Sequence, residues 1–457
     1  MLRKALVFLP ILLMAAEWDR FRGPNGSGIR EETNPPLRFG PKENLAWRTA
    51  VPFGRSSPVL GGGAVFLTAS GNALLVTLAL DAATGGIRWR RELKPRHTHR
   101  IYQSNDAASP SPATDGQHVY AFFADFGLIS YTADGAERWR LPLGPFENFY
   151  GMGASPVIAG STLLLSADQR KDSYLLAVDK DTGRIRWKAD RGHLELEGYS
   201  TPIVHQGQVI VHSSFRVEAY SLSTGKLVWH ARRQGYNAKG TPVIYRDLLI
   251  ASASGSDQPV YPTFQALDAN GDGRITPAEF DRNDDLRGHF PTVDTNHDGY
   301  ATPAEWNFIR GLGVGDYGMC GIRLGGAGDV TDSHIVWRNK KTYPNVPAPL
   351  VYKDVLYAIR NGGIVTSYDP MTGTAIKSVR VRDGLGDYYA SPVAAAGRIY
   401  LAGESGKVAV VKAGPELDTL AVNDLGEEIY ATPALDHERI YIRTTQALYA
   451  FGGRTSK

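Results

Sequence analysis

Two short stretches of the chain carry oxygen-bearing side chains at the spacing of a cation-binding loop. The first, "DANGDGRITPAE", covers residues 268–279, and the second, "DTNHDGYATPAE", covers residues 294–305. Each has carboxylate or amide side chains at positions 1, 3 and 5, glycine at 6 for a sharp turn, and a chelating glutamate at 12. Oxygen ligands in this order suit calcium. The predicted ligands are Asp268, Asn270, Asp272, Arg274 (backbone carbonyl), Thr276 and Glu279, and then Asp294, Asn296, Asp298, Tyr300 (backbone carbonyl), Thr302 and Glu305.

The residues around the two loops repeat as well. Both loops read Thr-Pro-Ala-Glu near their ends, where Thr can cap an outgoing helix and Pro suits its first position. Two matching loops predict a pair of calcium-binding EF-hands over residues 262–311, with two ions; an acidic, turn-rich linker is the alternative. The apolar flanks also match: Phe264, Leu267 and Phe280 around the first loop, and Phe290, Val293 and Trp306 around the second.

Two details separate this pair from a signalling EF-hand. Ala301 stands at position 8 of the second loop, where Ile275 of the first is the usual kind of residue for pairing the loops. Only 14 residues lie between Glu279 and Asp294, so the helices between the loops must be short. A sensor opens a helix pair to expose a groove. We therefore expect the calcium to be structural.

The rest of the chain is built from a repeat typical of short β-strands. The pattern Ala-x-Asp-x-x-Thr-Gly-x-x-x-Trp occurs over residues 79–89 and 177–187, and a third copy at 219–229 has Ser221 in place of Asp. Asp and Thr can hydrogen-bond the backbone of a turn, and Gly supplies its positive φ. The Trp that follows is large enough to be buried between neighbouring sheets.

A second marker, Ser or Thr followed by Pro and then a hydrophobic strand, gives the number of repeats. Most spacings are 40 to 54 residues, the length of a four-stranded propeller blade. The sequence predicts an all-β, eight-bladed propeller over residues 45–457, with the EF-hand pair inserted in blade five and the strand of Trp47 closing the last blade; an open β-solenoid is the alternative. The markers are Ser57, Ser111, Ser155, Thr201, Thr241, an eroded copy at Ala348, Ser391 and Thr432.

These repeats resemble those of the quinoprotein-like (PQQ-like) eight-bladed β-propeller family. In one branch of that family, pyrroloquinoline quinone (PQQ) and calcium sit in the propeller centre and oxidise alcohols, typically beneath a disulfide between adjacent cysteines. In another, the propeller is a scaffold, as in an outer-membrane protein assembly factor. This chain has one cysteine, Cys320, so that disulfide cannot form. The resemblance favours a calcium-binding scaffold or binding protein at the cell envelope; a PQQ-dependent oxidoreductase of alcohol or sugar dehydrogenase type is the alternative.

Residues just before each marker should converge on one mouth of the central channel. They are rich in tyrosine and polar groups, which suits binding of a peptide, a sugar or a quinone. The alternative is that the tyrosines simply fill the tapering centre. No catalytic residue stands out. The candidate channel residues are Asn105, Asp106, Tyr150, Tyr199, Tyr236, Asn237, Lys239, Tyr388 and Tyr389.

The N-terminus predicts export. Residues 1–16 combine two basic residues with an apolar run too short to span a bilayer, as in a signal peptide. Residues 17–44, which include "WDRFRGPNGSG", form an N-terminal arm expected to pack against the propeller. A formal net charge of +3 carries no signature of nucleic-acid binding, and no later segment reaches transmembrane length. We expect a periplasmic or extracellular protein whose partners are calcium and, at the propeller mouth, envelope proteins, peptides or sugars.

Overall fold

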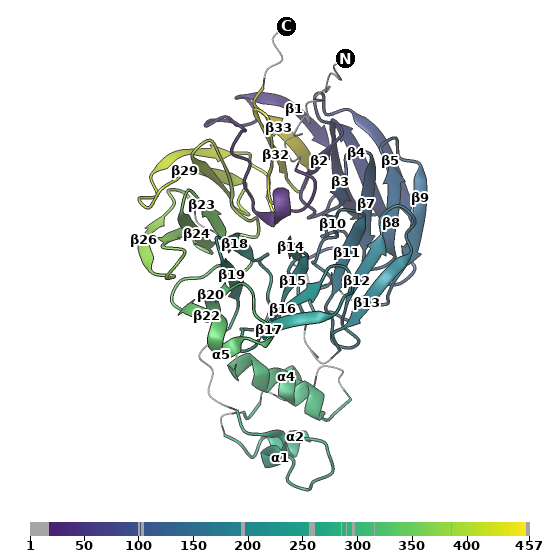
Figure 1. Cartoon of the computed structure of the whole chain (residues 1–457), viewed down its shortest axis with the longest axis vertical. Coiled ribbons are helices and arrows are strands. Elements are labelled where there is room, and N and C mark those ends of the chain that lie inside the picture. Colours follow the sequence, from purple (N-terminus) through teal and green to yellow (C-terminus); the bar gives the residue numbers. More distant parts are fainter. Residues whose placement is uncertain are drawn as a thin grey trace, which may run out of the picture.

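The computed structural model describes residues 18–98, 101, 105–192, 197–255, 261–284, 286–288, 290–294, 298–314, 316–384 and 386–453. The predicted signal peptide, residues 1–16, lies outside them, as does Asn296. The described strands form eight sheets of at least four strands each, set side by side around a central axis (Figure 1). The prediction of an all-β, eight-bladed propeller is therefore confirmed.

Within each blade, successive strands are antiparallel neighbours, ordered from the axis outward. The first four blades are β2 (Val59–Gly61), β3 (Ala64–Gly71), β4 (Leu74–Asp81) and β5 (Ile87–Leu93); β6 (Ala113–Thr114), β7 (His118–Phe123), β8 (Gly127–Thr132) and β9 (Glu137–Pro142); β10 (Val157–Ala159), β11 (Thr162–Ala167), β12 (Tyr174–Asp179) and β13 (Ile185–Asp190); and β14 (Ile203–His205), β15 (Gln208–Ser213), β16 (Arg216–Ser221) and β17 (Leu227–Ala231).

The last four blades continue the same order. They are β18 (Val243–Tyr245), β19 (Leu248–Ala253), β20 (Gly318–Arg323) and β22 (Ile335–Asn339); β23 (Leu350–Tyr352), β24 (Val355–Arg360), β25 (Ile364–Tyr368) and β26 (Ala375–Arg380); β27 (Val393–Ala395), β28 (Arg398–Ala402), β29 (Lys407–Lys412) and β30 (Thr419–Asp424); and β31 (Ala434–Asp436), β32 (Arg439–Arg443), β33 (Ala447–Phe451) and β1 (Leu45–Ala50).

The eighth blade joins the two ends of the chain. Strand β1, which carries Trp47, pairs antiparallel with β33 and is the outer strand of that blade. Because the first strand of the ring completes the last blade, the ring has no gap through which it could open. A fifth strand, β21 (Gly328–Asp329), adds to blade four by pairing parallel with β17, and the short helix α5 (Thr331–His334) follows it.

The Ser/Thr-Pro markers form a hydrogen-bonded ring around the axis. The backbone N–H of Ser57 donates to Ser111 Oγ (2.8 Å), equivalent bonds join most of the other neighbouring blades, and Thr432 N–H donates to Ser57 Oγ (2.9 Å). Each of these hydroxyls thus satisfies a backbone donor of the neighbouring blade near the narrow centre, whereas the hydroxyl of Thr241 has no such partner. The remaining described links run from Ser111 to Ser155, Ser155 to Thr201, Ala348 to Ser391, and Ser391 to Thr432.

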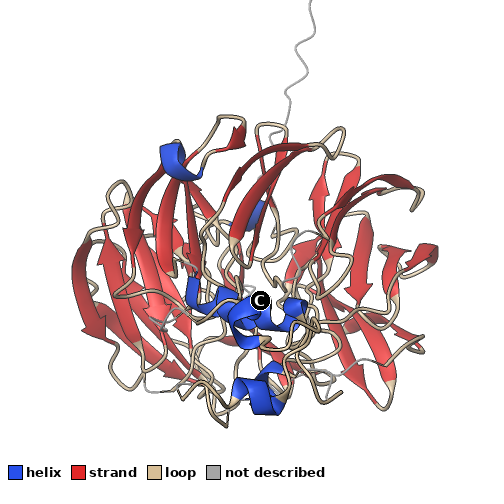
Figure 2. Cartoon of the chain, turned by 90° about the horizontal axis from the view of Figure 1, so that it is seen from below, coloured by secondary structure: helices blue, strands red, loops and turns tan. Residues whose placement is uncertain are grey.

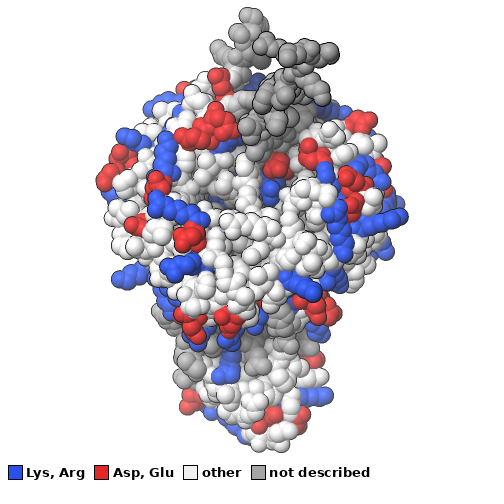
Figure 3. Space-filling view, viewed as in Figure 1, with Lys and Arg blue, Asp and Glu red and all other residues white. Residues whose placement is uncertain are grey.

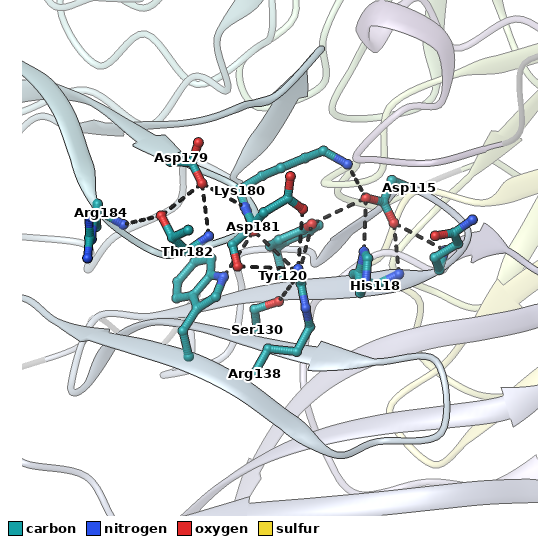
Figure 4. A network of polar contacts seen from close by, with 12 residues as sticks. Asp115, His118, Tyr120, Ser130, Arg138, Asp179, Lys180, Asp181, Thr182 and Arg184 are labelled. Carbon is teal, nitrogen blue, oxygen red and sulfur yellow. Dashed lines mark hydrogen bonds and ion pairs between the residues drawn. The ribbon is translucent and has the colours of Figure 1, made fainter.

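Five tryptophans of the repeat hold the next blade through a glycine, whereas Trp229 donates to Gln208 Oε1 of its own blade (3.0 Å). Trp139 Nε1 on β9 donates to the carbonyl of Lys180 in the next blade (2.9 Å), and a Cβ on Gly183 would lie 2.7 Å from the Trp139 ring. Figure 4 shows this junction, where Arg138 also reaches the turn around Asp181. The glycine is therefore needed twice, for its positive φ and because an indole packs on its Cα. Four other pairs share this arrangement: Trp47 with Gly85, Trp89 with Gly135, Trp187 with Gly225, and Trp337 with Gly373.

The helices of the predicted insert lie between β19 and β20 of blade five. They extend away from the ring (Figure 1), and Figure 2 shows them in blue against the red strands. They have a small core of their own around Phe280 and Trp306, both 0 % exposed. The helices are α1 (Phe264–Leu267), α2 (Pro277–Phe280), α3 (Phe290–Val293) and α4 (Pro303–Val314).

Candidate functional site: a funnel closed by the N-terminal arm

The N-terminal arm does not pack on the outside of the propeller but crosses its central channel. In Figure 1 its single turn of 3₁₀ helix, η1 (Pro24–Gly26), lies at the centre of the ring. Backbone N–H groups of the inner strands donate to it: Leu60 to the Trp18 carbonyl and Thr114 to the Asp19 carbonyl, both at 2.8 Å. The arm therefore acts as a plug across one end of the channel.

The plug is fastened to blades on opposite sides of the ring. Asn25 makes two bonds with Val204 of blade four, accepting from its N–H (3.0 Å) and donating to its carbonyl (2.9 Å). The N–H of Ala394 in blade seven donates to the Gly28 carbonyl (2.8 Å). Arg30 forms an ion pair with Asp436 of blade eight (2.7 Å). Together with its bonds to blades one and two, and with the hydrogen bond from Tyr352 of blade six to Glu31, the arm ties six blades to one segment.

The open end of the channel is a funnel of about 630 Å³, with Phe21 of the plug among its lining residues. That volume lies within the range of small-ligand sites. Of the nine residues predicted for the channel, five line this funnel: Asn105, Tyr150, Tyr199, Lys239 and Tyr389.

The other four predicted residues lie outside the funnel lining, each for a local reason. Asp106 accepts from the N–H of Ala108 and so holds a turn. Tyr236 forms an isolated β-bridge with Ser254, and the backbone N–H of its neighbour Asn237 donates to Ser214. Tyr388 is 3 % exposed and donates to the Gly384 carbonyl. At these four positions the tyrosine and polar residues form turns, a β-bridge or buried packing contacts.

The funnel also contains residues that the sequence did not point to. Arg55 stacks over the ring of Tyr430, 4.4 Å from its centre, and the Tyr430 hydroxyl donates to Glu404 (2.7 Å). Burial, reinforced by Glu404, raises the pKa of Tyr430 to about 12. Arg55 follows the Trp47 strand, and Glu404 lies in the turn between β28 and β29. The arrangement of the blades brings these residues together in the funnel, and no local sequence motif indicates it.

Lys239 is the second basic side chain of the funnel lining. Its Nζ donates to Asn345 Oδ1 (3.1 Å) and lies 5.6 Å from the centre of the Tyr150 ring. Burial lowers the pKa of Lys239 to about 8. On the same side, Tyr150 and Tyr199 meet edge to face with ring centres 5.5 Å apart, so aromatic surface lies next to the ammonium group.

The lining does not fit a calcium–quinone pair. Calcium takes six to eight oxygen ligands, several of them usually carboxylates. Glu404 is the carboxylate of the lining, and one of its oxygens accepts from Tyr430. Asn345 Oδ1 accepts from Lys239 and from Ser254, and Asn105 Oδ1 accepts from the N–H of Asp106. The funnel lining therefore offers one carboxylate, and both of its side-chain amide oxygens accept hydrogen bonds within the protein.

The two predicted calcium loops have matching hydrogen bonds. In the first, Asp268 accepts from the N–H groups of Asp272 (3.1 Å) and Gly273 (3.0 Å). In the second, Asp294 accepts from Asp298 (3.1 Å) and Gly299 (3.0 Å). The side chain of the first residue therefore accepts the same two backbone hydrogen bonds in both loops, which gives the two loops the same turn.

The last residue of each loop is also held alike. One oxygen of Glu279 accepts from the N–H (2.9 Å) and the hydroxyl (2.8 Å) of Thr276, as Glu305 does from Thr302 at the same distances. The Thr276 N–H is the largest influence lowering the pKa of Glu279. Within the described part of the chain, no group of three or more His, Cys, Asp or Glu side chains is arranged to hold a metal ion. The loop glutamates are turned toward backbone amides.

The two loops are joined at their eighth positions. Ile275 and Ala301 form an isolated antiparallel bridge, with N–H to carbonyl distances of 2.9 and 2.8 Å. Ala301 thus pairs through its backbone although its side chain is small. Of the other predicted ligands, Asn270 and Asp272 lie on the first loop, where their side chains contact each other (3.1 Å), and the ring of Tyr300 on the second loop lies under the guanidinium of Arg274 at 4.1 Å.

Comparison with known families finds one match that covers most of the chain. The family model described as outer membrane protein assembly factor BamB matches residues 41–150, 75–279 and 324–457. The unmatched span 280–323 contains the second predicted loop and α4. No curated protein matches the chain. Among the described residues, none of the helices has the length and apolar character needed to cross a membrane.

Solved structures show the same fold at low sequence identity. BamB from Moraxella catarrhalis is 14 % identical with a TM-score of 0.54, over 90 % of this chain and 99 % of that one. A europium-containing methanol dehydrogenase is 11 % identical with a TM-score of 0.60, over 96 % and 99 %. Quinohemoprotein alcohol dehydrogenase from Comamonas testosteroni is 11 % identical with a TM-score of 0.62, over 97 % and 82 %. An assembly factor and two dehydrogenases thus share one architecture, which does not decide function.

Proposed function

The chain belongs to the family of propellers described as outer membrane protein assembly factor BamB, and from this we propose that it is an exported binding scaffold of the cell envelope. The observation that carries the proposal is the funnel, closed at one end by the arm and lined by tyrosines and a few charged groups. Concave, partly aromatic sites with a few convergent polar groups are the usual form of ligand sites. Export rests on the signal-like residues 1–16 and on the family.

We further propose that the insert is a pair of EF-hands that binds two calcium ions. Support comes from the ligand spacing repeated in both loops, from their matching hydrogen bonds, and from the Ile275–Ala301 bridge that joins them. Binding requires the glutamate at position 12 to turn from the backbone amides toward the ion. Outside the cytosol, sites with dissociation constants of about 10⁻⁴ to 10⁻³ M would be substantially filled, so calcium would be structural.

Site-specific photocrosslinking in the native envelope tests the scaffold proposal. A photoreactive amino acid at Tyr389, inside the funnel, should trap a defined partner or ligand, and excess purified chain should compete for it. The matched control places the same group at Ile376 on β26, which is 51 % exposed on the outside of blade six. Identical products from both positions, or none from Tyr389, would refute funnel binding.

The oxidoreductase alternative is testable on the same purified protein. If PQQ and calcium are added and the quinone stays bound through gel filtration, with dye reduction by alcohols or sugars, the chain is an enzyme and the scaffold proposal is wrong. We expect the quinone to separate from the protein, because the funnel lacks the oxygen ligands that a calcium–quinone pair needs.

A further inference from the structure

The hydrogen-bonded ring around the axis is interrupted at Thr241, where two successive links, from Thr201 to Thr241 and from Thr241 to Ala348, are missing. Ala348 stands where the other blades have Ser or Thr, so the N–H of Thr241 has no hydroxyl to donate to at that step. The hydroxyl of Thr241 itself has no hydrogen-bond partner among the described residues, although the residue is 0 % exposed and lines the funnel. Buried hydroxyls are normally paired, so a polar ligand group at this part of the funnel wall would satisfy a donor that is otherwise unpaired.

An uncompensated cation lies beside this gap. Lys239 is two residues from Thr241, and its recorded contacts are an amide oxygen of Asn345 and the face of Tyr150. No carboxylate of the described chain pairs with it; Glu404, in the same funnel, holds Tyr430 instead. A half-buried ammonium without a counter-ion is unfavourable, because solvent is partly removed and no opposite charge replaces it.

An anion entering the funnel would remove this penalty. It would give Lys239 a partner in a site of reduced dielectric, where a charge-assisted hydrogen bond is roughly twice as strong as a neutral one. The lowered pKa of Lys239 is consistent with the missing partner, since burial is its sole cause. The other basic residue of the lining, Arg55, lies with Tyr430 and the Asn105 carbonyl.

The shape of the funnel restricts which ligands can place an anionic group beside Lys239. The arm closes the far end, so a chain cannot thread through the propeller, and an end of a chain or a small molecule must enter from the open mouth. The paired rings of Tyr150 and Tyr199 offer an apolar surface next to Lys239.

We propose that Lys239, Thr241 and Asn345 form a subsite for a carboxylate group whose neighbouring ring or aliphatic portion packs on Tyr150 and Tyr199. The subsite rests on the proposed binding function of the funnel and specifies its ligand: an acid, presented as the C-terminus of a polypeptide or as a small organic acid. Lys239 binds the carboxylate, Thr241 donates its hydroxyl to it, and Asn345 holds the lysine in place.

Calorimetric titration of the full-length mature chain tests the subsite. The probes are acetyl-Gly-Gly-Phe with a free C-terminal carboxylate, the same peptide as its C-terminal amide, and benzoate. We expect the peptide acid to bind at least tenfold more tightly than the amide. If benzoate binds as tightly as the peptide acid, the ligand is a small acid; if it binds much more weakly, the ligand is a chain end.

Variants distinguish the subsite from general attraction of anions. Lys239→Met keeps the length of the side chain without its charge and should lose at least tenfold in affinity for the acid, whereas Lys226→Met, on the exposed turn after Thr224, should change nothing. Thermal melting of both variants verifies that they fold. Equal binding of acid and amide, full binding by K239M, or no binding of any probe at millimolar concentration overturns the subsite. If crosslinking from Tyr389 still traps a partner in K239M, the funnel function stands and only the subsite fails.

Discussion

At the scale of single residues, the glycine of each repeat turn has the most demanding position. Gly183 has φ +74°, and any Cβ there would lie 2.7 Å from the Trp139 ring of the preceding blade. Gly160, in the same blade, has φ +60° but nothing within 4 Å of its added Cβ. Substitutions at these two glycines therefore separate the free-energy cost of a side chain at positive φ from the cost of disturbing the contact between blades.

We therefore predict that Gly183→Ala destabilises the protein more than Gly160→Ala does. The control should cost about 1 kcal/mol for placing alanine at positive φ. The junction variant should cost about 2–4 kcal/mol, because an overpacked contact adds to that strain. Urea denaturation followed by tryptophan fluorescence measures both. Equal losses would mean that the Trp–Gly contact contributes nothing beyond turn geometry.

His212 on β15 should make the protein sensitive to acid. It is 1 % exposed, neither ring nitrogen has a described partner, and burial lowers its pKa from 6.5 to about 4. Between these values the unfolded chain binds a proton that the folded chain does not, so stability falls as pH falls from 6.5 to 4. At about 1.4 kcal/mol per pH unit, the loss approaches 3 kcal/mol.

Replacing this side chain tests its share of the acid sensitivity. Unfolding free energies measured in urea at several pH values should fall less steeply for His212→Leu than for the wild type between pH 6.5 and 4. Parallel curves for the two proteins would show that His212 is not the group responsible.

At the scale of elements, the inserted helices are too short to be stable by themselves, since isolated helices under about 12 residues are marginal in water. Helices α1, α2 and α3 have four residues each. Their stability must come from the shared core around Trp306 and, by our proposal, from bound calcium. Trp306 is buried in this core, on the helix that follows the second loop, and can serve as the donor for terbium luminescence.

Calcium binding predicts a specific luminescence result on the full chain. Terbium should give a sensitised signal that calcium displaces, and Glu279→Gln combined with Glu305→Gln should abolish it, because each loop loses its bidentate carboxylate. Asp332→Asn, on the exposed end of α5, is the matched acidic control and should leave the signal unchanged. A signal that survives the double substitution would exclude these loops as the metal sites.

At the scale of the whole molecule, two N-terminal segments hold the ring together in different ways. Strand β1 supplies the outer edge of blade eight, while the arm bonds to the inner strands of six blades. On the face seen in Figure 3, charges of both signs are scattered over the surface without a large area of one sign.

Two truncations should separate the roles of arm and strand. A chain starting at residue 44 keeps β1 and should still fold, with a lower melting temperature, because the inner strands lose their bonds to the arm. A chain starting at residue 52 also loses β1 and should aggregate, since β33 becomes an exposed edge. Circular dichroism melts and gel filtration give the comparison; identical behaviour of the two truncations would contradict the closing role of β1.

Local spacing determined the number of blades and the candidate calcium loops. The Trp repeat and the Ser/Thr-Pro marker recur at blade length because each blade meets the same packing problem with its neighbour. The EF-hand interpretation likewise depends on positions within twelve residues. Such patterns are legible in the sequence because the residues that cooperate are close together along the chain.

Only the tertiary structure decided how the centre of the ring is built. The arm's place in the channel, the pairing of Thr432 with Ser57, and the meeting of Arg55 with Tyr430 and Glu404 join residues hundreds of positions apart. Four of the nine predicted channel residues instead serve turns, a bridge or packing, because a shift of one or two residues along a turn redirects a side chain. Proximity to the axis depends on the closure of all eight blades, which no single repeat encodes.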